Sequence, residues 1–209
     1  MKILILGATG SIGRHLVPQA LAQGHEVTAL VRDPSKLEPR RERLRVVTGD
    51  ALDPAAVDAA VRGQEAVIFS LGRSNHRTPT TMFSDATRIL VHAMETHGVR
   101  RLVCITGIGA GDSRGHGGFL YDKIIFPWIT KETYLDKDRQ EALIRESSLD
   151  WIIVRPAAFN NDPQRGSLRA VTDLKNITIR SISRADAAAF VLEQLRSDRY
   201  LHKAPLVGY

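Results

Sequence analysis

The chain has 209 residues, 43% of them hydrophobic, which suits a single domain, 1–209, with a sizeable core. Twenty-nine basic against 23 acidic residues leave a net charge of +6, which suits an anionic ligand but is too small to indicate a nucleic-acid partner. A lone cysteine excludes a disulfide framework, and no apolar run is long enough to span a membrane, so we expect a soluble cytoplasmic protein. The seven histidines show no metal-ligand spacing, so we expect no metal.

Apolar runs alternate with amphipathic stretches along the first half of the chain. Lys2–Leu6 predicts a strand buried on both faces, and helical spacing over 11–23 predicts a helix that Gly24 ends. Further on, the same patterns predict strands over Glu26–Val31, 44–49 and 65–70, a helix over 53–61 with Asp53 as its N-cap, and a helix over about 80–97.

The second half continues this alternation less regularly. We expect a strand over 100–106, a mobile glycine-rich loop over 107–118, a helix over 131–147, a strand over Asp150–Pro156, a loop over 157–176, a short strand over 177–180 and a helix over 184–195. Such βα units have right-handed connections. The order therefore predicts an α/β fold with a doubly wound parallel sheet, a Rossmann-type fold with a small C-terminal substrate-loop region. Ligands bind such sheets at the carboxyl ends of the strands.

Three glycines follow the first strand in the pattern GxxGxxG: Gly7, Gly10 and Gly13. Glycines let the backbone approach a pyrophosphate, and the N–H groups that open the next helix favour negative charge. Three glycines could form only a tight turn, but the strand–turn–helix context is the one that a dinucleotide site requires. The expected contacts to the cofactor in this stretch are Gly7, Thr9, Gly10, Ser11, Ile12, Gly13 and Arg14.

The end of the second strand indicates which cofactor binds. An NAD site needs a carboxylate there for the ribose 2'-hydroxyl, whereas an NADP site needs cations for the 2'-phosphate. Here Arg32 ends the strand, Lys36 follows one turn later, and Arg14 could contact the same phosphate. We therefore predict NADP(H), although Asp33 could take the part of the NAD carboxylate.

The ends of the third and fourth strands complete the expected cofactor site. Asp50 and Ala51 follow the third strand, where a carboxylate could accept from the adenine amino group. Ser70, Leu71 and Gly72 close the fourth, where small residues let the central part of the cofactor pass close to the backbone.

At these motifs the chain resembles the atypical short-chain dehydrogenase/reductases of the NAD(P)H-binding, NmrA-like type, and within them the biliverdin-IXβ reductase/flavin reductase group. The stretches that carry the resemblance include "GATGSIGRHL", "VTALVRDPSKL" and "LIRESSLDWIIVRP". The resemblance implies a Rossmann-type fold, NADPH as hydride donor, a flavin, tetrapyrrole or quinone as acceptor, and a monomer.

The sequence departs from the catalytic pattern of these reductases. Lys137 falls at the position of the family's lysine, but Thr133 stands at the tyrosine position and Gly107, after Thr106, at the serine position. Tyr134 is one residue off, about 100° around a helix. Ala158 stands where the biliverdin reductase group has a histidine, so biliverdin is not expected as the substrate.

A flavin or quinone is already electrophilic, so its reduction needs little beyond proximity. We therefore predict a flavin reductase-like enzyme in which Thr106 and Lys137 hold the nicotinamide ribose and Pro156 and Ala157 flank the nicotinamide. Tyr121 and Tyr134 are candidate proton donors. The segments 108–130 and 158–175 should form the acceptor pocket, to which four aromatic residues could contribute unless they only pack in the core: Phe119, Tyr121, Trp128 and Phe159.

Two other functions stay open. The missing acid and the glycine-rich loop would also suit a non-catalytic NADP(H)-binding redox sensor. The glycine motif is shared with NAD(P)-dependent epimerases and dehydratases, but their chemistry needs the tyrosine and usually a longer C-terminal region. The acidic pair Glu132 and Asp136 is interpreted as a solvated helix face.

Overall fold

The computed structural model describes residues 1–37, 42–73 and 75–209. Its strands are β1 (Lys2–Leu6), β2 (Glu26–Val31), β3 (Leu44–Thr48), β4 (Ala66–Phe69), β5 (Arg101–Ile105), β6 (Asp150–Pro156), β7 (Ala158–Asn160), β8 (Arg169–Val171), β9 (Ser181–Ser183) and β10 (Leu206–Gly208). Its longer helices are α1 (Gly13–Ala22), α2 (Pro54–Val61), α3 (Met82–Thr96), α4 (Lys131–Glu146) and α5 (Arg184–Glu193). Two short 3-10 turns, η1 (Pro34–Lys36) and η2 (Gly111–Ser113), and a π-helix, η3 (Tyr121–Thr130), complete the described elements.

The main sheet has eight strands in the order β3-β2-β1-β4-β5-β6-β10-β8. All neighbours from β3 to β10 pair in parallel, and β8 pairs antiparallel to β10. The chain runs outward from β1 to β3 and then returns to place β4 on the other side of β1. The carboxyl ends of β1 and β4 therefore form the topological switch point, where this class of sheet binds its ligands.

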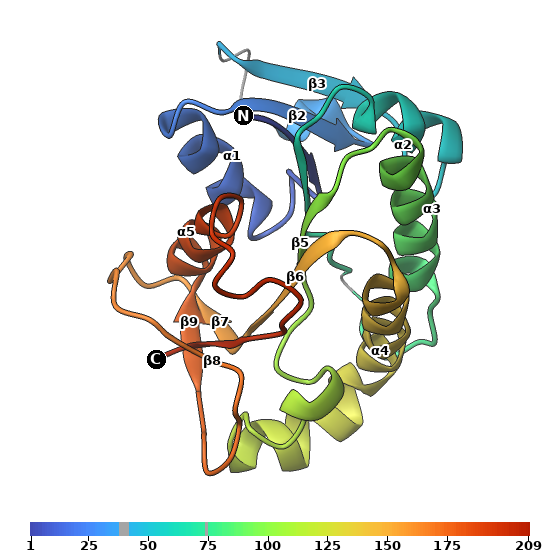
Figure 1. The fold of residues 1–209 in the computed structure, drawn as a ribbon. Coiled ribbons are helices and arrows are strands. Elements are labelled where there is room, and N and C mark those ends of the chain that lie inside the picture. The colour runs from blue at the N-terminus through green and yellow to red at the C-terminus, as the bar shows by residue number, and fades with distance from the viewer. Residues whose placement is uncertain (38–41, 74) are drawn as a thin grey trace.

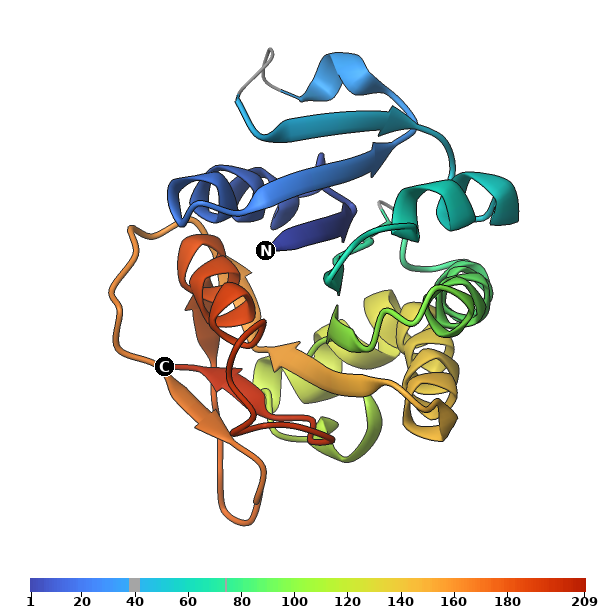
Figure 2. The same cartoon turned by 45° about the horizontal axis from the view of Figure 1, so that its top comes forward.

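Helices cover both faces of the sheet (Figures 1 and 2). Helices α1 and α5 lie on one face, and α2, α3 and α4 lie on the other. Alternate residues of β1 serve the two layers, since Ile3 and Ile5 belong to the core under α1 and α5, whereas Leu4 and Leu6 belong to the core under α2 and α3. The doubly wound α/β prediction is confirmed.

The N-termini of α2 and α3 are stabilised in different ways. As predicted, Asp53 caps α2 by accepting a hydrogen bond from the Ala55 N–H at 3.0 Å. The N-cap residue of α3 makes no side-chain cap. Instead Asp136 of α4 accepts from the Phe83 N–H at 2.8 Å and the Ser84 hydroxyl at 2.6 Å. Asp136 is completely buried, so its interpretation as a solvated residue is wrong.

Several predictions for the second half of the chain are wrong. Residues 177–180 are not a strand, and pairing with β7 begins only at Ser181, because the Ile179 N–H donates to the His116 carbonyl at 3.3 Å instead of to a strand. The glycine-rich segment 107–118 begins as a packed element: Ile108 and Ser113 are buried, and the Ser113 hydroxyl lies within hydrogen-bond distance of the Ile108 and Ala110 carbonyls. No hydrophobic pattern in the sequence predicted η3, β7, β8 or β10.

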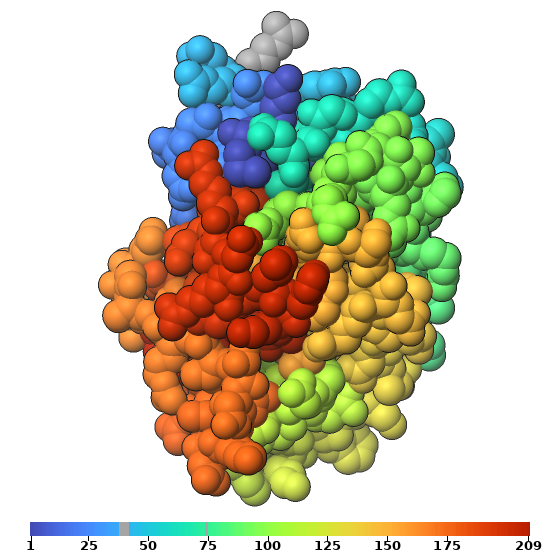
Figure 3. Space-filling model, in the orientation of Figure 1, coloured from blue at the N-terminus to red at the C-terminus, as the bar shows by residue number. Residues whose placement is uncertain are grey.

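The C-terminal residues complete the sheet. Leu206 and Val207 are fully buried in β10, which pairs with both β6 and β8. Figure 3 shows this segment, in red, packed between the orange segment that precedes α5 and the gold residues of α4 and β6. In β5, Cys104 is also fully buried, and burial raises the pKa of its thiol to about 12. Among the described helices, none has the length and apolar character needed to cross a membrane.

Candidate functional site

The glycine loop is a turn in which side chains do not fit. Gly7 has φ +87°, and a Cβ there would collide with the Ser70 carbonyl at the end of β4. A Cβ on Gly13 would collide with the Gly7 carbonyl. The Gly10 N–H donates to the Gly7 carbonyl at 2.9 Å, and α1 begins without a side-chain cap on its free N–H groups. The turn therefore leaves an uncapped helix N-terminus at the switch point, which favours an anion.

A pocket of about 220 Å³ lies at the carboxyl ends of β1, β2 and β3. The backbone turn after β4 closes its other side. The sequence-predicted cofactor residues in its lining are Gly7, Thr9, Gly10, Arg32, Asp50, Ala51, Leu71 and Gly72. One Asp50 carboxylate oxygen already accepts from the Leu52 N–H at 3.0 Å. The other residues predicted to contact the adenosine half, Arg14 and Lys36, line a neighbouring hollow with Leu37.

The Asp33 carboxylate, the candidate partner for an NAD ribose, accepts hydrogen bonds from Ser35. Asp33 Oδ1 accepts from the Ser35 N–H at 3.1 Å and the Ser35 hydroxyl at 2.6 Å, which caps η1. These hydrogen bonds from Ser35, helped by Lys36 at 3.5 Å, lower the pKa of Asp33. Arg32 is exposed and lines the pocket. At the end of β2 the group available to a ligand is therefore a guanidinium.

A second pocket, of about 310 Å³, continues along the same edge of the sheet. It shares Gly10, Leu71 and Gly72 with the first, so one elongated ligand can follow both. Its further predicted residues are Ser11, Ile12, Ser70, Thr106, Tyr134 and Lys137. The Ser70 hydroxyl oxygen is buried and, among the described residues, has no hydrogen-bond partner. Such an orphaned polar atom in a pocket wall fits a site that a polar ligand completes.

Lys137 and Thr106 meet in this second pocket. Lys137 Nζ donates to the Ile105 carbonyl at 3.2 Å and lies 4.6 Å from the centre of the Phe83 ring. Burial lowers the pKa of Lys137 to about 8. The Thr106 hydroxyl donates to Glu141 Oε1 at 2.8 Å. Thr106 can therefore only accept a hydrogen bond from a ligand, whereas Lys137 retains donors.

Sequence reasoning missed the buried network that holds Thr106 in place. The Arg155 guanidinium is almost completely enclosed and donates to both oxygens of Glu141, at 3.0 and 2.6 Å, and also to Asp112. Gly111 has φ +53°, and a Cβ there would collide with Arg155. The partners come from η2, α4 and β6, so no local pattern signals them. The network fixes the carboxylate that binds the Thr106 hydroxyl.

The two tyrosines predicted as proton donors are poorly placed for that role. The Tyr134 ring packs against Gly107 and Gly109, and burial raises its pKa well above the usual value. The Tyr121 ring packs against Gly117, and its hydroxyl interacts with that of Tyr134. Burial also raises the pKa of Tyr121. Tyr134 lines the second pocket, whereas Tyr121 is not among its lining residues.

Other residues predicted near the nicotinamide and the acceptor are dispersed. Pro156 and Ala157 are buried at the end of β6, where the Pro156 carbonyl accepts from the Ile108 N–H at 3.0 Å. Phe159 lines the second pocket beneath the Arg184 guanidinium, which lies 5.4 Å from its ring centre. Phe119 and Trp128 are 78% and 77% exposed, so neither packs in the core.

Three further charged or ionisable residues line this pocket: Arg73, which ends the stretch Ser70–Arg73 that closes the fourth strand, and His76 and Arg184, which no motif indicated. Arg73 donates to Thr78, and Arg184 donates to the Asn160 carbonyl and the Asn161 side chain. The only other ionisable residues in the described lining of this pocket are Lys137 and Tyr134. The described lining contains no carboxylate. This pocket therefore favours an anionic ligand.

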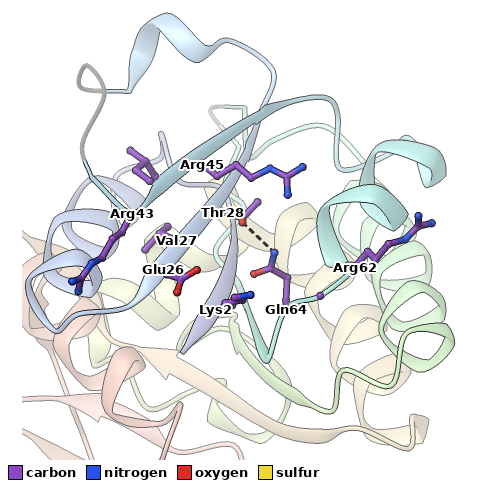
Figure 4. Close-up of a pocket in the computed structure, with 10 residues that line it drawn as sticks. Lys2, Glu26, Val27, Thr28, Arg43, Arg45, Arg62 and Gln64 are labelled. Carbon is purple, nitrogen blue, oxygen red and sulfur yellow. Dashed lines mark hydrogen bonds between the residues drawn. The ribbon is translucent and has the colours of Figure 1, made fainter.

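A third hollow, of about 400 Å³, lies at the opposite edge of the sheet (Figure 4). It is lined by Lys2, Arg43, Arg45 and Arg62 around Glu26, and Gln64 donates to the Thr28 hydroxyl at 3.1 Å. These residues surround the amino ends of β1, β2 and β3, away from the glycine loop. Among the described residues, no cluster of His, Cys, Asp and Glu could hold a metal ion.

Comparison with known proteins agrees with this geometry. A family model of NAD(P)H-binding proteins matches residues 7–198. The "Uncharacterized sugar epimerase YhfK" of Bacillus subtilis is 26% identical over 93% of this chain and 88% of its own length. Two solved structures have a TM-score of 0.83: the anaerobillin reductase ChuY of Escherichia coli O157:H7, 23% identical over 100% of this chain and 97% of its own, and a short-chain dehydrogenase/reductase of Veillonella parvula in complex with NADP, 21% identical over 100% and 94%.

Proposed function

Because the chain belongs to the NAD(P)H-binding family, we propose that it is an NADPH-dependent oxidoreductase that reduces a planar acceptor, a flavin or a quinone. The observation that carries this proposal is the pair of connected pockets at the switch point. A dinucleotide that follows their shared residues, Gly10, Leu71 and Gly72, extends from Arg32 toward Lys137. The orphaned Ser70 hydroxyl and the side-chain-free turn around Gly7 support the fit.

The preference for NADPH rests on the end of β2. Arg32 is the charged group that lines the first pocket at the end of β2, and Arg14 and Lys36 add positive charge beside it. The carboxylate of Asp33 is held by Ser35 instead of facing a ribose. A ribose 2'-phosphate would therefore find cations here, whereas an unphosphorylated ribose would lack its carboxylate partner.

In this proposal the chain binds and orients the reactants. Bound NADPH would supply a hydride. Lys137 would donate a hydrogen bond to the nicotinamide ribose and Thr106 would accept one, because the Thr106 hydroxyl already donates its hydrogen to Glu141. The positions of Thr133 and Tyr134 leave no tyrosine to polarise a carbonyl, which suits an acceptor that is itself electrophilic.

The charges of the second pocket narrow the acceptor class. Arg73 and Arg184 would attract an anionic group of the acceptor, and the Phe159 ring beside Arg184 would offer an apolar surface to a planar one. A phosphorylated flavin such as FMN combines both features, whereas a neutral quinone uses only the second. We therefore expect FMN to be reduced with a lower KM than riboflavin.

Steady-state oxidation of NADPH tests the reaction. FMN, FAD, riboflavin and water-soluble quinones would serve as acceptors, and biliverdin would test a tetrapyrrole. We expect turnover with at least one flavin or quinone and a several-fold rise in the KM for FMN, but not for riboflavin, in Arg184→Gln. Absence of turnover above background with every acceptor would reject the reductase and favour the redox sensor, which binds NADPH without consuming it.

A binding titration tests the cofactor separately. NADPH should bind at least tenfold more tightly than NADH, and Arg32→Asp should remove most of that preference. Arg45→Asp is the matched control, because it makes the same charge change at the opposite edge of the sheet. Equal affinity of the unmodified protein for both cofactors would refute the role given to Arg32.

Epimerase chemistry, suggested by the name of the Bacillus subtilis relative, has less support. That chemistry needs a tyrosine acid at the position of Thr133, and Tyr134 directs its ring against Gly107 and Gly109. Burial of Tyr134 further disfavours its ionised form. The reductase proposal needs neither group.

A further inference from the structure

His76 lies where the site lacks an acid. It comes from the segment that follows β4, and its Nδ1 is 3.1 Å from the hydroxyl of Thr133, the residue at the family's tyrosine position. Thr133 is buried, and the two side chains line the same pocket as Lys137 and Thr106. A segment distant in sequence thus brings an imidazole to the place of the missing tyrosine.

The two ring nitrogens of His76 have different surroundings. Nδ1 lies within hydrogen-bond distance of the Thr133 hydroxyl, which also lies 3.5 Å from the His76 backbone carbonyl, so Thr133 contacts both the ring and the backbone of His76. Among the described residues, no group bonds Nε2. A histidine anchored through one nitrogen presents the other to a ligand as a donor or acceptor of a proton.

We infer that His76 is the proton donor to the acceptor, an inference that rests on the reductase function proposed above. Two-electron reduction of a flavin or quinone adds one hydride and one proton; the hydride comes with the cofactor, and the proton must come from elsewhere. As negative charge develops on a nitrogen or oxygen of the acceptor, that atom takes the proton from Nε2 and the Nε2–H bond breaks. The imidazole then takes a proton from water. Thr133 is a positioning residue.

The groups around His76 set the pH at which it can act. Arg73 faces it from its own segment, Lys137 and Tyr134 from α4, and Arg184 from α5. Burial, then Arg73, then Lys137 lower the pKa of His76 below 6.5. An anionic acceptor bound between these cations would raise the pKa of His76 again. The donor is the imidazolium, so kcat/KM should fall as pH rises through a pKa below 6.5.

Variants of His76 test the inference in the full-length protein. We expect His76→Ala to lower kcat with FMN by about 10²-fold or more, to leave the Kd for NADPH unchanged and to remove the decline of kcat/KM with rising pH. Added imidazole should restore part of the rate. Thr133→Val should lower kcat less, and His92→Gln, at an exposed position of α3, should have no effect. An unchanged kcat and pH profile in His76→Ala would overturn the inference.

An NMR titration of the His76 ring separates this inference from the reductase proposal. In the unliganded protein its pKa should lie below 6.5, and it should rise when FMN binds, even if NADPH is not consumed. A rise without turnover in any acceptor would reject the reductase proposal but retain His76 as the group that meets the acceptor. A pKa that FMN leaves unchanged would reject His76.

Discussion

Lys137 shows how a single buried charge affects both binding and stability. Its ammonium has one carbonyl and one aromatic face as close partners, and burial lowers its pKa from 10.5 to about 8. The neighbouring Cys104 thiol shifts in the opposite direction, to about 12, because burial disfavours its ionised form. A buried ammonium at this position is unfavourable for folding stability. The contact with a ligand that we propose for Lys137 would explain why a lysine occupies it.

The pKa of Lys137 predicts a specific pH dependence of stability. Between pH 8 and 10.5 the folded protein loses this proton while the unfolded chain keeps it, so this group makes the free energy of unfolding rise with pH. Lys137→Met removes that contribution, which amounts to about 3 kcal/mol over the window. Urea unfolding of both proteins at a series of pH values measures the difference.

A second titrating group and one control variant bear on the measurement with Lys137→Met. The Cys104 thiol makes stability fall above pH 9, but it is present in both proteins and largely cancels in the difference. Lys131→Met, at an exposed position at the start of α4, should leave the slope unchanged. A difference between the unmodified protein and Lys137→Met that stays constant from pH 8 to 10.5 would contradict the shifted pKa.

Among the elements, α3 and α4 depend on each other. Helix α3 has no side-chain cap of its own, and Asp136 of α4 supplies its N-terminal acceptor from a completely buried position. Arg139, one turn later, donates to the Thr80 carbonyl just before α3 at 2.7 Å. The pair of helices that lines one side of the second pocket is thus joined by polar contacts as well as by packing.

Removing the Asp136 carboxylate should destabilise the protein more than removing an ordinary cap. Asp136→Ala leaves a buried N–H and a buried hydroxyl without their charged acceptor, and we expect a loss of about 3 kcal/mol. Asp53→Ala removes only the local cap of α2 and should cost about 1 kcal/mol. Urea denaturation followed by circular dichroism measures both. Equal losses would show that Asp136 acts only as a local cap.

The predictable elements are those whose signal is local. β1, the glycine turn and α2 carry their own hydrophobic pattern, turn residues or cap, and the sequence located them to within a residue or two. β10 has three residues, and its place follows from pairing with β6, some 50 residues earlier in the chain. The sequence predicted a solvated Asp136, because its hydrogen-bond partners on α3 lie more than 50 residues away in the chain.

The candidate site divides in the same way. The residues proposed to bind the cofactor follow one glycine motif and the ends of successive strands, so spacing alone could predict them. The residues proposed to meet the acceptor are Arg73, His76, Thr133, Phe159 and Arg184. Phe159 was predicted there from its segment, but only the tertiary fold shows that the other four line the same pocket. No periodicity or motif could have indicated that His76 meets Thr133.

For the whole molecule, cofactor binding should appear as stability. A ligand that binds only the folded state at 100 times its Kd adds about 2.7 kcal/mol to the free energy of unfolding. For a chain of this length we expect NADPH to raise Tm by about 5–10 °C. NADH at the same concentration should raise Tm less, and Arg32→Asp should remove most of that difference. Differential scanning fluorimetry measures all three, and equal shifts with both cofactors would contradict the proposed site.

The burial of Cys104 has a kinetic consequence. Its sulfur lies in β5 between two helical layers, and at neutral pH the folded protein holds it as an unreactive thiol. A thiol reagent can therefore label this protein only when the sheet opens. Because the chain has one cysteine, each labelled molecule records one opening event, and the labelling rate reports how often the core is exposed.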